Sequence, residues 1–483
     1  MSAAMSESGD SDVTDDELFR FVDRRDSSFS SHRIRDYPLD ILGRIFVFWR
    51  DAWWARHLFS GVKQGHLHYG MRAPFVLSAV CRQFRLAAEN TPELWAFIYI
   101  DFDSQHRMNI NHLTDRLHRI LHLAGTSRLT LCFQDINSDA LSTEWFTQLR
   151  RILDPMRPQW FELLASFSQP GDLAACWKLW PLATPSLSTM RLLGSVEERP
   201  TTVPSSRFLA QCQALRKIEL RNIAWIHNAV FPTVEVLSIG PSTGSILGQT
   251  SIIHLCKSFP SIVKLRLLAF ENSGLTAHAE PFPDSLQMAR LKSLTVSPIL
   301  LRTSLVGLQH RRHLPALMSV SVHFSNYEDV ASVDGDDDDE GSEKKRRSED
   351  LQAVGDFLRE LPIETLKLCG LDKDYEPLAI RSHIFETMNK TILKHLYFKN
   401  CTEHTTHYVG AALRPVTLEG GGGNFYLAHL HSLHLIRCKQ VDGVEVLSFV
   451  EYGPRSLREV VVQESDIEEE KYEDVKALLS KRG

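Results

Sequence analysis

One short string in the sequence has the residue types of a serine hydrolase. Gly240, Ser242 and Gly244 fit the pattern G-x-S-x-G, in which a strained turn between a strand and a helix exposes a nucleophilic serine hydroxyl. That chemistry also requires histidine and carboxylate partners on an α/β-hydrolase sheet. Here the string follows an apolar strand pattern that ends at Ile239, where Gly and Pro are typical of a turn. A hydrolase that uses Ser242 therefore remains an alternative, and we favour a protein that is not an enzyme.

Histidines and cysteines are the next residues with potential chemistry. His118 and His122 lie four residues apart in a helical pattern, as metal ligands can, but the glutamate of H-E-x-x-H is missing between them. The same spacing fits the surface of an amphipathic helix, which is the interpretation we favour. The eight cysteines, from Cys81 to Cys438, include no C-x-x-C pair. We expect reduced thiols in the cytosol or nucleus, no metal site and no cofactor.

The length and charge of the chain indicate which kind of protein positions these residues. A chain of 483 residues exceeds what one hydrophobic core usually supports, so several units or an open repeat array are expected. Much of the formal net charge of −6 comes from the N-terminal tail and from residues 334–340. The sequence shows no basic stripe with interleaved aromatics, no secretory signal and no long apolar span. We expect no nucleic-acid partner and no membrane segment.

Two helical patterns follow a polar, acidic tail over residues 1–33, which is expected to be disordered. The first pattern begins at Pro38, a residue tolerated in a first helical turn, and repeats apolar residues at three- and four-residue steps. The second begins at Ala73 and stops at Asn90. A strand rich in β-branched and aromatic residues comes directly after. We therefore expect a small helical domain over residues 34–100.

The motifs of this domain resemble those of the F-box family, in the form common among fungal members. The sequence has Pro-Leu-x-x-Leu-x-x-Ile-Phe, then Leu-x-x-Val-Cys-Arg-x-Phe, then Thr-Pro-x-Leu-Trp, although Tyr37 stands where the family usually has leucine. The resemblance implies that an apolar helical face binds a Skp-type adaptor. An alternative is that the same residues form the core of a helical cap on the repeat domain. The matching residues are Pro38, Leu39, Leu42, Ile45, Phe46, Leu77, Val80, Cys81 and Phe84.

The second half of the chain repeats an apolar triad of the form Φ-x-x-Φ-x-Φ, where Φ is an apolar residue. The triads begin at Leu187, Leu215, Val234, Ile262, Leu291, Leu317, Ile363, Leu393, Leu430 and Leu457. Six of the nine intervals lie between 26 and 30 residues, which is the range of leucine-rich repeats. Cys401 and Cys438 each follow the last triad position by three residues, as in the cysteine-containing repeats that often accompany an F-box.

These patterns predict an α/β fold: a small N-terminal F-box followed by an irregular leucine-rich-repeat solenoid over residues 185–483, with a curved parallel sheet and helices on its convex face. Residues 101–184, with a helix-like run that ends in FELLASF, are interpreted as degenerate leading repeats. An acidic and basic insert over residues 328–350 is expected to be disordered. Its KKRR string at 344–347 fits either a nuclear localisation signal or a solvated loop.

Side chains alternate along a strand, so residues between the buried apolar positions should line the concave face. Most of those with a charge or a ring are basic or aromatic, against only two glutamates. A basic face in a net-acidic chain suggests an acidic or phosphorylated target protein, although solvated surface charges would give the same pattern. The predicted target-binding residues are Arg191, Lys217, Arg221, Lys264, Arg266, Lys367, His395, Tyr397, Lys399 and His434.

The resemblance implies a non-enzymatic substrate receptor of a Skp, cullin and F-box ubiquitin ligase complex, in the cytoplasm, the nucleus or both. Its partners would be the adaptor, with the cullin ligase complex, and an unidentified target protein. Periodicity alone indicates only a binding solenoid. A leucine-rich-repeat interaction scaffold without a ligase role is therefore the first alternative, and the Ser242 hydrolase is the second.

Overall fold

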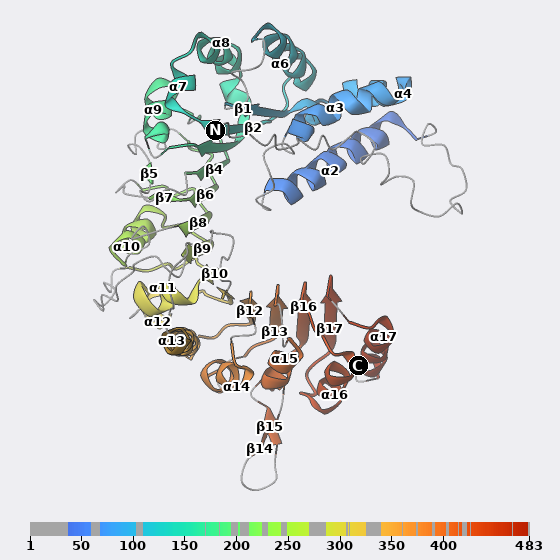
Figure 1. Ribbon diagram of the computed structural model, residues 1–483, viewed down its shortest axis with the longest axis vertical. Coiled ribbons are helices and arrows are strands. Elements are labelled where there is room, and N and C mark those ends of the chain that lie inside the picture. Colours follow the sequence, from blue (N-terminus) through green and yellow to red (C-terminus); the bar gives the residue numbers. More distant parts are fainter. Residues whose placement is uncertain are drawn as a thin grey trace, which may run out of the picture. The chain divides into compact units, whose positions relative to one another are not determined.

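The chain forms two compact units, Met1–Trp95 and Ala96–Gly483, shown as a ribbon in Figure 1. The expected domain boundary at residue 100 is wrong, because strand β1 (Phe97–Asp101) pairs with β2 (Leu129–Ile136) inside the sheet of unit 2. The computed structural model describes residues 37–58, 68–102, 110–169, 171–182, 184–194, 201–202, 212–224, 230–242, 249–269, 286–305, 308, 310–324, 340–359, 361–372, 375–388, 392–401, 405–413, 415–417, 423–425, 427–465 and 467–481. The predicted N-terminal tail lies outside these residues.

Unit 1 is helical in its described residues. Its helices are α2 (Leu39–Leu58), α3 (His68–Val80), α4 (Arg82–Glu89) and α5 (Pro92–Trp95). The second helical pattern of the sequence is broken at Cys81, which is extended (φ −159°, ψ 171°) and whose thiol accepts a hydrogen bond from the Phe84 amide at 3.5 Å. Cys81 is therefore the N-cap of α4. The fully buried Trp95 indole donates a hydrogen bond to the Ala88 carbonyl at 2.7 Å, which fixes α5 against α4.

Unit 2 has an α/β fold. Thirteen strands of its described residues form one sheet in sequence order, and every pairing in that sheet is parallel. The sheet is open, with β1 and β17 at its edges. After β1 and β2 the strands are β3 (Trp160–Phe167), β4 (Thr189–Leu193), β6 (Lys217–Arg221), β8 (Val236–Ser242), β9 (Lys264–Ala269), β10 (Ser293–Val296), β11 (Ser319–His323), β12 (Thr365–Cys369), β13 (His395–Lys399), β16 (Ser432–Ile436) and β17 (Glu459–Gln463).

The predicted apolar triads are confirmed as the buried side of this sheet. Each of the ten triads places its last two residues on one strand, from β4 to β17, and all triad residues are buried except the half-buried Val462. Strand pairing aligns equivalent positions, so that Leu366 pairs with Leu396 and Leu368 with Phe398. Each strand thus covers the apolar side chains of its neighbours, which is how a repeat array forms a continuous core.

Helices connect most of the strands, and in Figure 1 helices α9 to α16 flank one side of the sheet. Short strands add two pairs outside the main sheet: β5 (Thr201–Thr202) with β7 (Ile223–Ala224), and β14 (Pro415–Thr417) with β15 (Gly423–Phe425). The helices are α6 (Ile110–Ala124), α7 (Ser138–Leu141), α8 (Glu144–Leu153), α9 (Asp172–Leu179), α10 (Gln249–Ser258), α11 (Pro298–Thr303), α12 (His310–His313), α13 (Glu340–Leu358), α14 (Pro377–Ile380), α15 (Thr405–Leu413), α16 (Gly443–Tyr452) and α17 (Glu469–Ser480), with a 3-10 turn at Asp154–Gln159 and a π turn at Arg381–Phe385.

Two local expectations are wrong. The run FELLASF is strand β3, because it buries Leu163 and Ala165 in register with Met190 and Leu192 of β4. Residues 340–350, expected to be disordered, belong to helix α13. The later part of α13 contains buried residues such as Val354, which anchor the helix. Arg302 of α11 also pairs with Glu349 at 2.7 Å and with Asp350 at 3.0 Å. The rest of the expected insert lies outside the described residues.

A repeated turn follows the strands and joins successive repeats. Asn222, Gly370, Asn400, Arg437 and Glu464 each follow the last residue of a strand and have φ between 50° and 73°.

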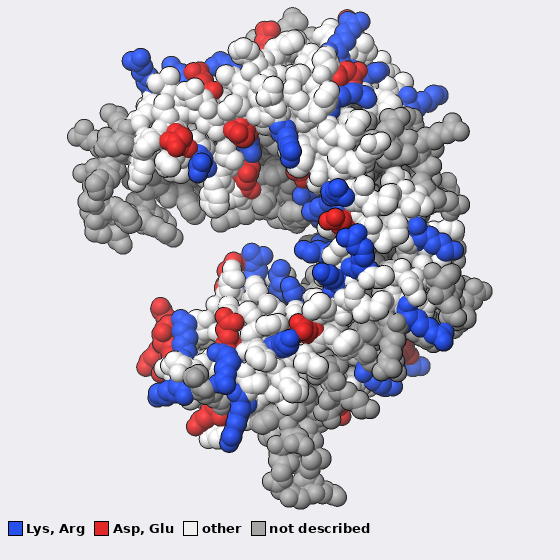
Figure 2. Space-filling view, turned by 180° about the vertical axis from the view of Figure 1, so that it is seen from behind, with Lys and Arg blue, Asp and Glu red and all other residues white. Residues whose placement is uncertain are grey.

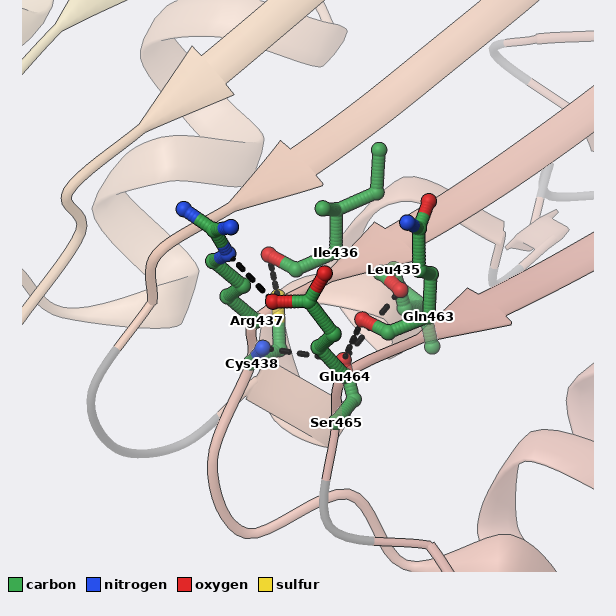
Figure 3. A network of polar contacts seen from close by, with 7 residues as sticks. All are labelled: Leu435, Ile436, Arg437, Cys438, Gln463, Glu464 and Ser465. Carbon is green, nitrogen blue, oxygen red and sulfur yellow. Dashed lines mark hydrogen bonds and ion pairs between the residues drawn. The ribbon is translucent and has the colours of Figure 1, made fainter. Parts of the chain in front are cut away.

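Figure 3 shows this turn in the last two repeats. The Arg437 amide donates to the Gln463 carbonyl at 2.8 Å, and its guanidinium pairs with Glu464 at 2.7 Å. Ser465, in the position that Cys438 has one repeat earlier, accepts from the Cys438 amide at 2.9 Å and donates to the Leu435 carbonyl at 3.2 Å. These bonds fix the register between neighbouring repeats.

Candidate protein-binding surfaces

Helix α2 of unit 1 is apolar on two faces. Its inward face carries Leu42 and Phe46, whose exposed fractions are 1% and 4%. Ile41, Ile45 and Phe48 follow one another at steps of four and three residues, and their exposed fractions are 38%, 48% and 75%. Residues at these steps share one side of a helix. We call these three residues the outer stripe; they form an apolar surface that the unit leaves exposed.

The nine residues expected to bind an adaptor differ in their exposure. Four are exposed, three are half-buried and two are buried: respectively Pro38, Leu39, Ile45 and Val80; Leu77, Cys81 and Phe84; Leu42 and Phe46. The Phe46 and Phe84 rings meet edge to face with centroids 5.0 Å apart, so the half-buried Phe84 packs against the core. A partner can reach the exposed members directly, whereas a substitution at Leu42 or Phe46 would first disturb the fold.

The motif comparison does not select Ile41 or Phe48, because it follows the apolar spacing typical of the family. A signal for them is nevertheless present in the sequence, since both recur at helical steps around Ile45. A helix that is apolar on more than one side needs more than one partner surface. The sequence of α2 therefore shows apolar residues for both faces, and only their burial in the structure distinguishes the core face from the outer stripe.

The open face of the unit 2 sheet carries the side chains that alternate with the buried triad residues. The ten residues predicted to bind a target all occupy these alternate positions; Lys264 and Lys399 are exposed, and the other eight are half-buried. We define the middle row as the residues that strand pairing aligns between the last two triad positions. This row is Arg191, Glu219, Ser238, Arg266, Thr295, Ser321, Lys367, Tyr397, His434 and Val461.

Ion pairs join the arginines of strands β3 to β6 to carboxylates. Arg191 lies 3.0 Å from Glu162 and 3.9 Å from the buried Glu219, and Arg221 lies 3.0 Å from the same Glu219 carboxylate. These guanidinium groups therefore neutralise carboxylates of the protein itself. The basic character expected here is therefore reduced, because neighbouring residues on the strands bring the carboxylates beside both arginines.

Strands β8 to β16 of the main sheet have a different character, since none of them contains Asp or Glu. Among the described residues, no ion pair joins Arg266, Lys367 or Lys399 to a carboxylate. The glutamates just before β8 and β12 are paired elsewhere: Glu235 with Arg216 at 3.9 Å and Glu364 with Lys394 at 2.7 Å. Figure 2 shows mainly basic side chains gathered beside this stretch of the sheet.

An aromatic stack adjoins these cations in the middle row. The Tyr397 and His434 rings are stacked with centroids 4.1 Å apart and an interplanar angle of 8°. On the other side of Tyr397, Lys367 Nζ lies 4.8 Å from the ring centroid. Ser432 Oγ links His395 Nδ1 at 2.7 Å to His434 Nε2 at 2.9 Å. Burial lowers the pKa of His434, so this ring is neutral at neutral pH.

The positive charges of this stretch converge near the ends of β11 and β12. Burial, together with the charges of Arg266 and Lys399, lowers the pKa of His323 to about 4. Cys369 pairs with His323 across the strands, and its thiol lies 3.6 Å from Ser321 Oγ. Burial raises the pKa of Cys369, whereas Lys399, Lys367 and Arg266 all lower it. Cations from three strands thus act on one small area of the open face.

The other residues with potential chemistry show no comparable arrangement. Ser242 ends β8, where its backbone pairs with Ala269, and α10 begins only at Gln249, whereas a nucleophile elbow joins strand and helix in a sharp turn. His118 and His122 are exposed on α6. The described residues contain no group of three or more His, Cys, Asp or Glu side chains that could hold a metal.

Two further observations concern larger features of the molecule. A cavity of about 610 Å³ is lined mainly by α11 and α13 and by no strand residue, so it is separate from the open face. Of the helices in the described ranges, none has the length and apolar character needed to cross a membrane.

Comparison with known proteins adds no family assignment. No family model matches the chain, and no curated protein matches it in sequence.

Proposed function

We propose that this protein is a substrate receptor of a Skp, cullin and F-box ubiquitin ligase complex. Unit 1 would be the F-box that binds the adaptor, and unit 2 a leucine-rich-repeat domain that binds the target protein. The receptor would perform no covalent chemistry itself. It would hold the target close to the charged ubiquitin-conjugating enzyme and so raise the target's effective concentration there. Such a role belongs in the cytoplasm or nucleus.

The outer stripe of α2 is the observation that carries the proposal. Its middle residue, Ile45, belongs to the motif that resembles the F-box, and the exposed fraction of its last residue, Phe48, reaches 75%. Exposed apolar patches on a small unit are typical of interaction sites. Covering these side chains would stabilise a complex by about 25 cal/mol per Å² of buried apolar area. This exposed stripe favours adaptor binding over a mere helical cap, because a cap would have no use for a second apolar side on α2.

Two features of unit 2 support a target-binding role. The parallel strands repeat at intervals typical of leucine-rich repeats and align equivalent residues across the sheet. The open face carries cations that the described residues leave without carboxylate partners. Repeat arrays commonly use such an extended sheet face for protein recognition.

The test is a pull-down of the full chain with a purified Skp-type adaptor. The variant with Ile45→Asp and Phe48→Asp should bind at least tenfold less adaptor than the wild type, because it places two carboxylates in the apolar contact. Leu378→Asp is the matched control, since Leu378 is 74% exposed on α14 of unit 2, and it should bind like the wild type. Wild-type protein that fails to bind adaptor, or a double variant that binds it normally, contradicts the proposal.

The same experiment separates the alternatives. An interaction scaffold would bind its target but no adaptor. A hydrolase that uses Ser242 would cleave members of a generic ester panel, and Ser242→Ala would abolish that activity.

A further inference from the structure

The open face contains a stretch of short hydroxyl side chains bordered by long basic ones. We call this stretch the hydroxyl floor: it comprises the outward residues with a hydroxyl group on β10, on β11 and at the start of β12, namely Ser293, Thr295, Ser319, Ser321 and Thr365. Bordering positions hold Lys264 and Arg266 on β9, Lys367 on β12, and His395, Tyr397 and Lys399 on β13. Strands lie ~4.8 Å apart, so cations from both borders can reach a group that rests on the floor.

Three of these cations act at the same place. Arg266 and Lys399 both lower the pKa of His323, and both of them and Lys367 lower that of its neighbour Cys369. Arg266 Nε is buried and has no hydrogen-bond partner among the described residues. Within the described ranges, no carboxylate therefore neutralises these charges, and at least one of their donors is unused.

We propose that the hydroxyl floor binds a phosphorylated serine or threonine of the target protein, held between Arg266 and Lys367 with Lys399 at the C-terminal end of the strands. The inference rests on the proposed function, since it names the feature of the target that unit 2 recognises. A phosphoryl group carries a charge of roughly −1.5 to −2 and three acceptor oxygens. A single carboxylate carries about −1, which would leave more of the charge of the three cations uncompensated.

The aromatic stack argues for a phosphoprotein and against single-stranded nucleic acid. Proteins that bind single strands stack bases on free aromatic faces. Tyr397 has no such face, because His434 covers one side and the Lys367 ammonium group the other. A phosphate on an extended peptide needs only the cations and the hydroxyl donors.

The experiment titrates the full chain against an immobilised peptide library with a central phosphoserine or phosphothreonine. The same library is tested unphosphorylated and with glutamate at the central position. We expect a subset of phosphopeptides to bind at least tenfold more tightly than either counterpart, and inorganic phosphate to displace them. Absence of any phosphate-dependent binding, or equal binding of the glutamate peptides, overturns the proposal.

Two sets of variants locate the binding. Arg266→Gln with Lys367→Gln and Lys399→Gln should weaken phosphopeptide binding at least tenfold. A matched triple variant removes equal charge from exposed helix positions and should bind within twofold of the wild type: Arg346→Gln, Lys345→Gln and Lys178→Gln. Thr295→Phe leaves every cation in place but fills the floor, so it should also weaken binding. If both floor variants bind normally while correctly folded, the site is elsewhere and the proposal is wrong.

Adaptor binding distinguishes this inference from the proposed function. The floor variants should retain the Skp-type adaptor, because the outer stripe lies in unit 1. Phosphopeptide binding without adaptor binding would contradict the proposed ligase role and support the phosphate site. Adaptor binding without phosphopeptide binding would contradict only the proposed phosphate site.

Discussion

Two arginines of the middle row show that neighbouring residues decide whether a charge is available to a ligand. Arg191 and Arg266 occupy equivalent positions of their repeats. Arg191 lies 3.0 Å from Glu162 on the neighbouring strand, whereas no described carboxylate pairs with Arg266. A charge that is paired within the protein contributes little to attracting a ligand, so only the second arginine is available for recognition.

At the residue scale, His323 should make stability depend on pH. Burial, with Arg266 and Lys399, holds its folded pKa at about 4, against about 6.5 when unfolded. Between these values the unfolded chain binds the proton and the folded chain does not, so stability falls as the pH falls from about 6.5 to 4. The loss is at most about 3 kcal/mol.

Denaturant midpoints at pH 7 and pH 4.5 test this. His323→Gln should show a smaller difference between the two midpoints than the wild type. His118→Gln, at an exposed position on α6, should keep the wild-type difference. An unchanged difference in His323→Gln would mean that other groups cause the dependence.

At the scale of elements, the packing of α13 depends on a close approach between Gly355 and the π turn. A Cβ atom at Gly355 would lie 1.8 Å from the His383 carbonyl oxygen of the π turn. That backbone atom cannot move away as a flexible side chain could. The helix that carries the KKRR string therefore packs against the π turn only because residue 355 has no side chain.

Gly355→Ala should destabilise the protein by roughly 1–3 kcal/mol, because α13 must shift away from the π turn. Thermal denaturation followed by circular dichroism measures the change. Gly171→Ala is the control, since a Cβ atom there meets nothing within 4 Å, and it should be close to neutral. Equal melting temperatures for the two variants would contradict the tight packing.

At the scale of the whole molecule, unit 2 is an array in which each strand is stabilised by its neighbours. Interior strands pair on both sides, whereas β1 and β17 pair on one. The last triad position shows the difference between β11 and β17: Val322 on β11 is fully buried, whereas Val462 on β17 is half-buried. Stability in such arrays is approximately a sum of repeat and interface contributions.

The same substitution should therefore cost more inside the array than at its edge. We expect Val320→Ala to destabilise by about 2–3 kcal/mol and Val460→Ala by about 1 kcal/mol, since the interior cavity relaxes less. Midpoints of urea denaturation measure both. A larger effect at Val460 would indicate that the terminal repeat limits the stability of the unit.

Much of the repeat domain could be predicted from the sequence, because its signal is local. The alternation within each triad places Leu366 and Leu368 on one side of a strand wherever that strand lies. The FELLASF run is an exception, because a short apolar run fits a helix and a strand equally well. Its assignment as β3 comes from its pairing with β2 and β4.

The sequence by itself determined the number and spacing of the triad strands, their buried sides and the apolar character of α2. Tertiary structure decided that Ile41 and Phe48 stay exposed while Leu42 and Phe46 do not. It also decided that Glu219 neutralises Arg191 and Arg221, whereas no carboxylate in the described part of the chain pairs with the cations of strands β8 to β16. The physical reason is separation along the chain. Periodicity relates residues a few positions apart, whereas burial and ion pairing depend on neighbours that only folding brings together.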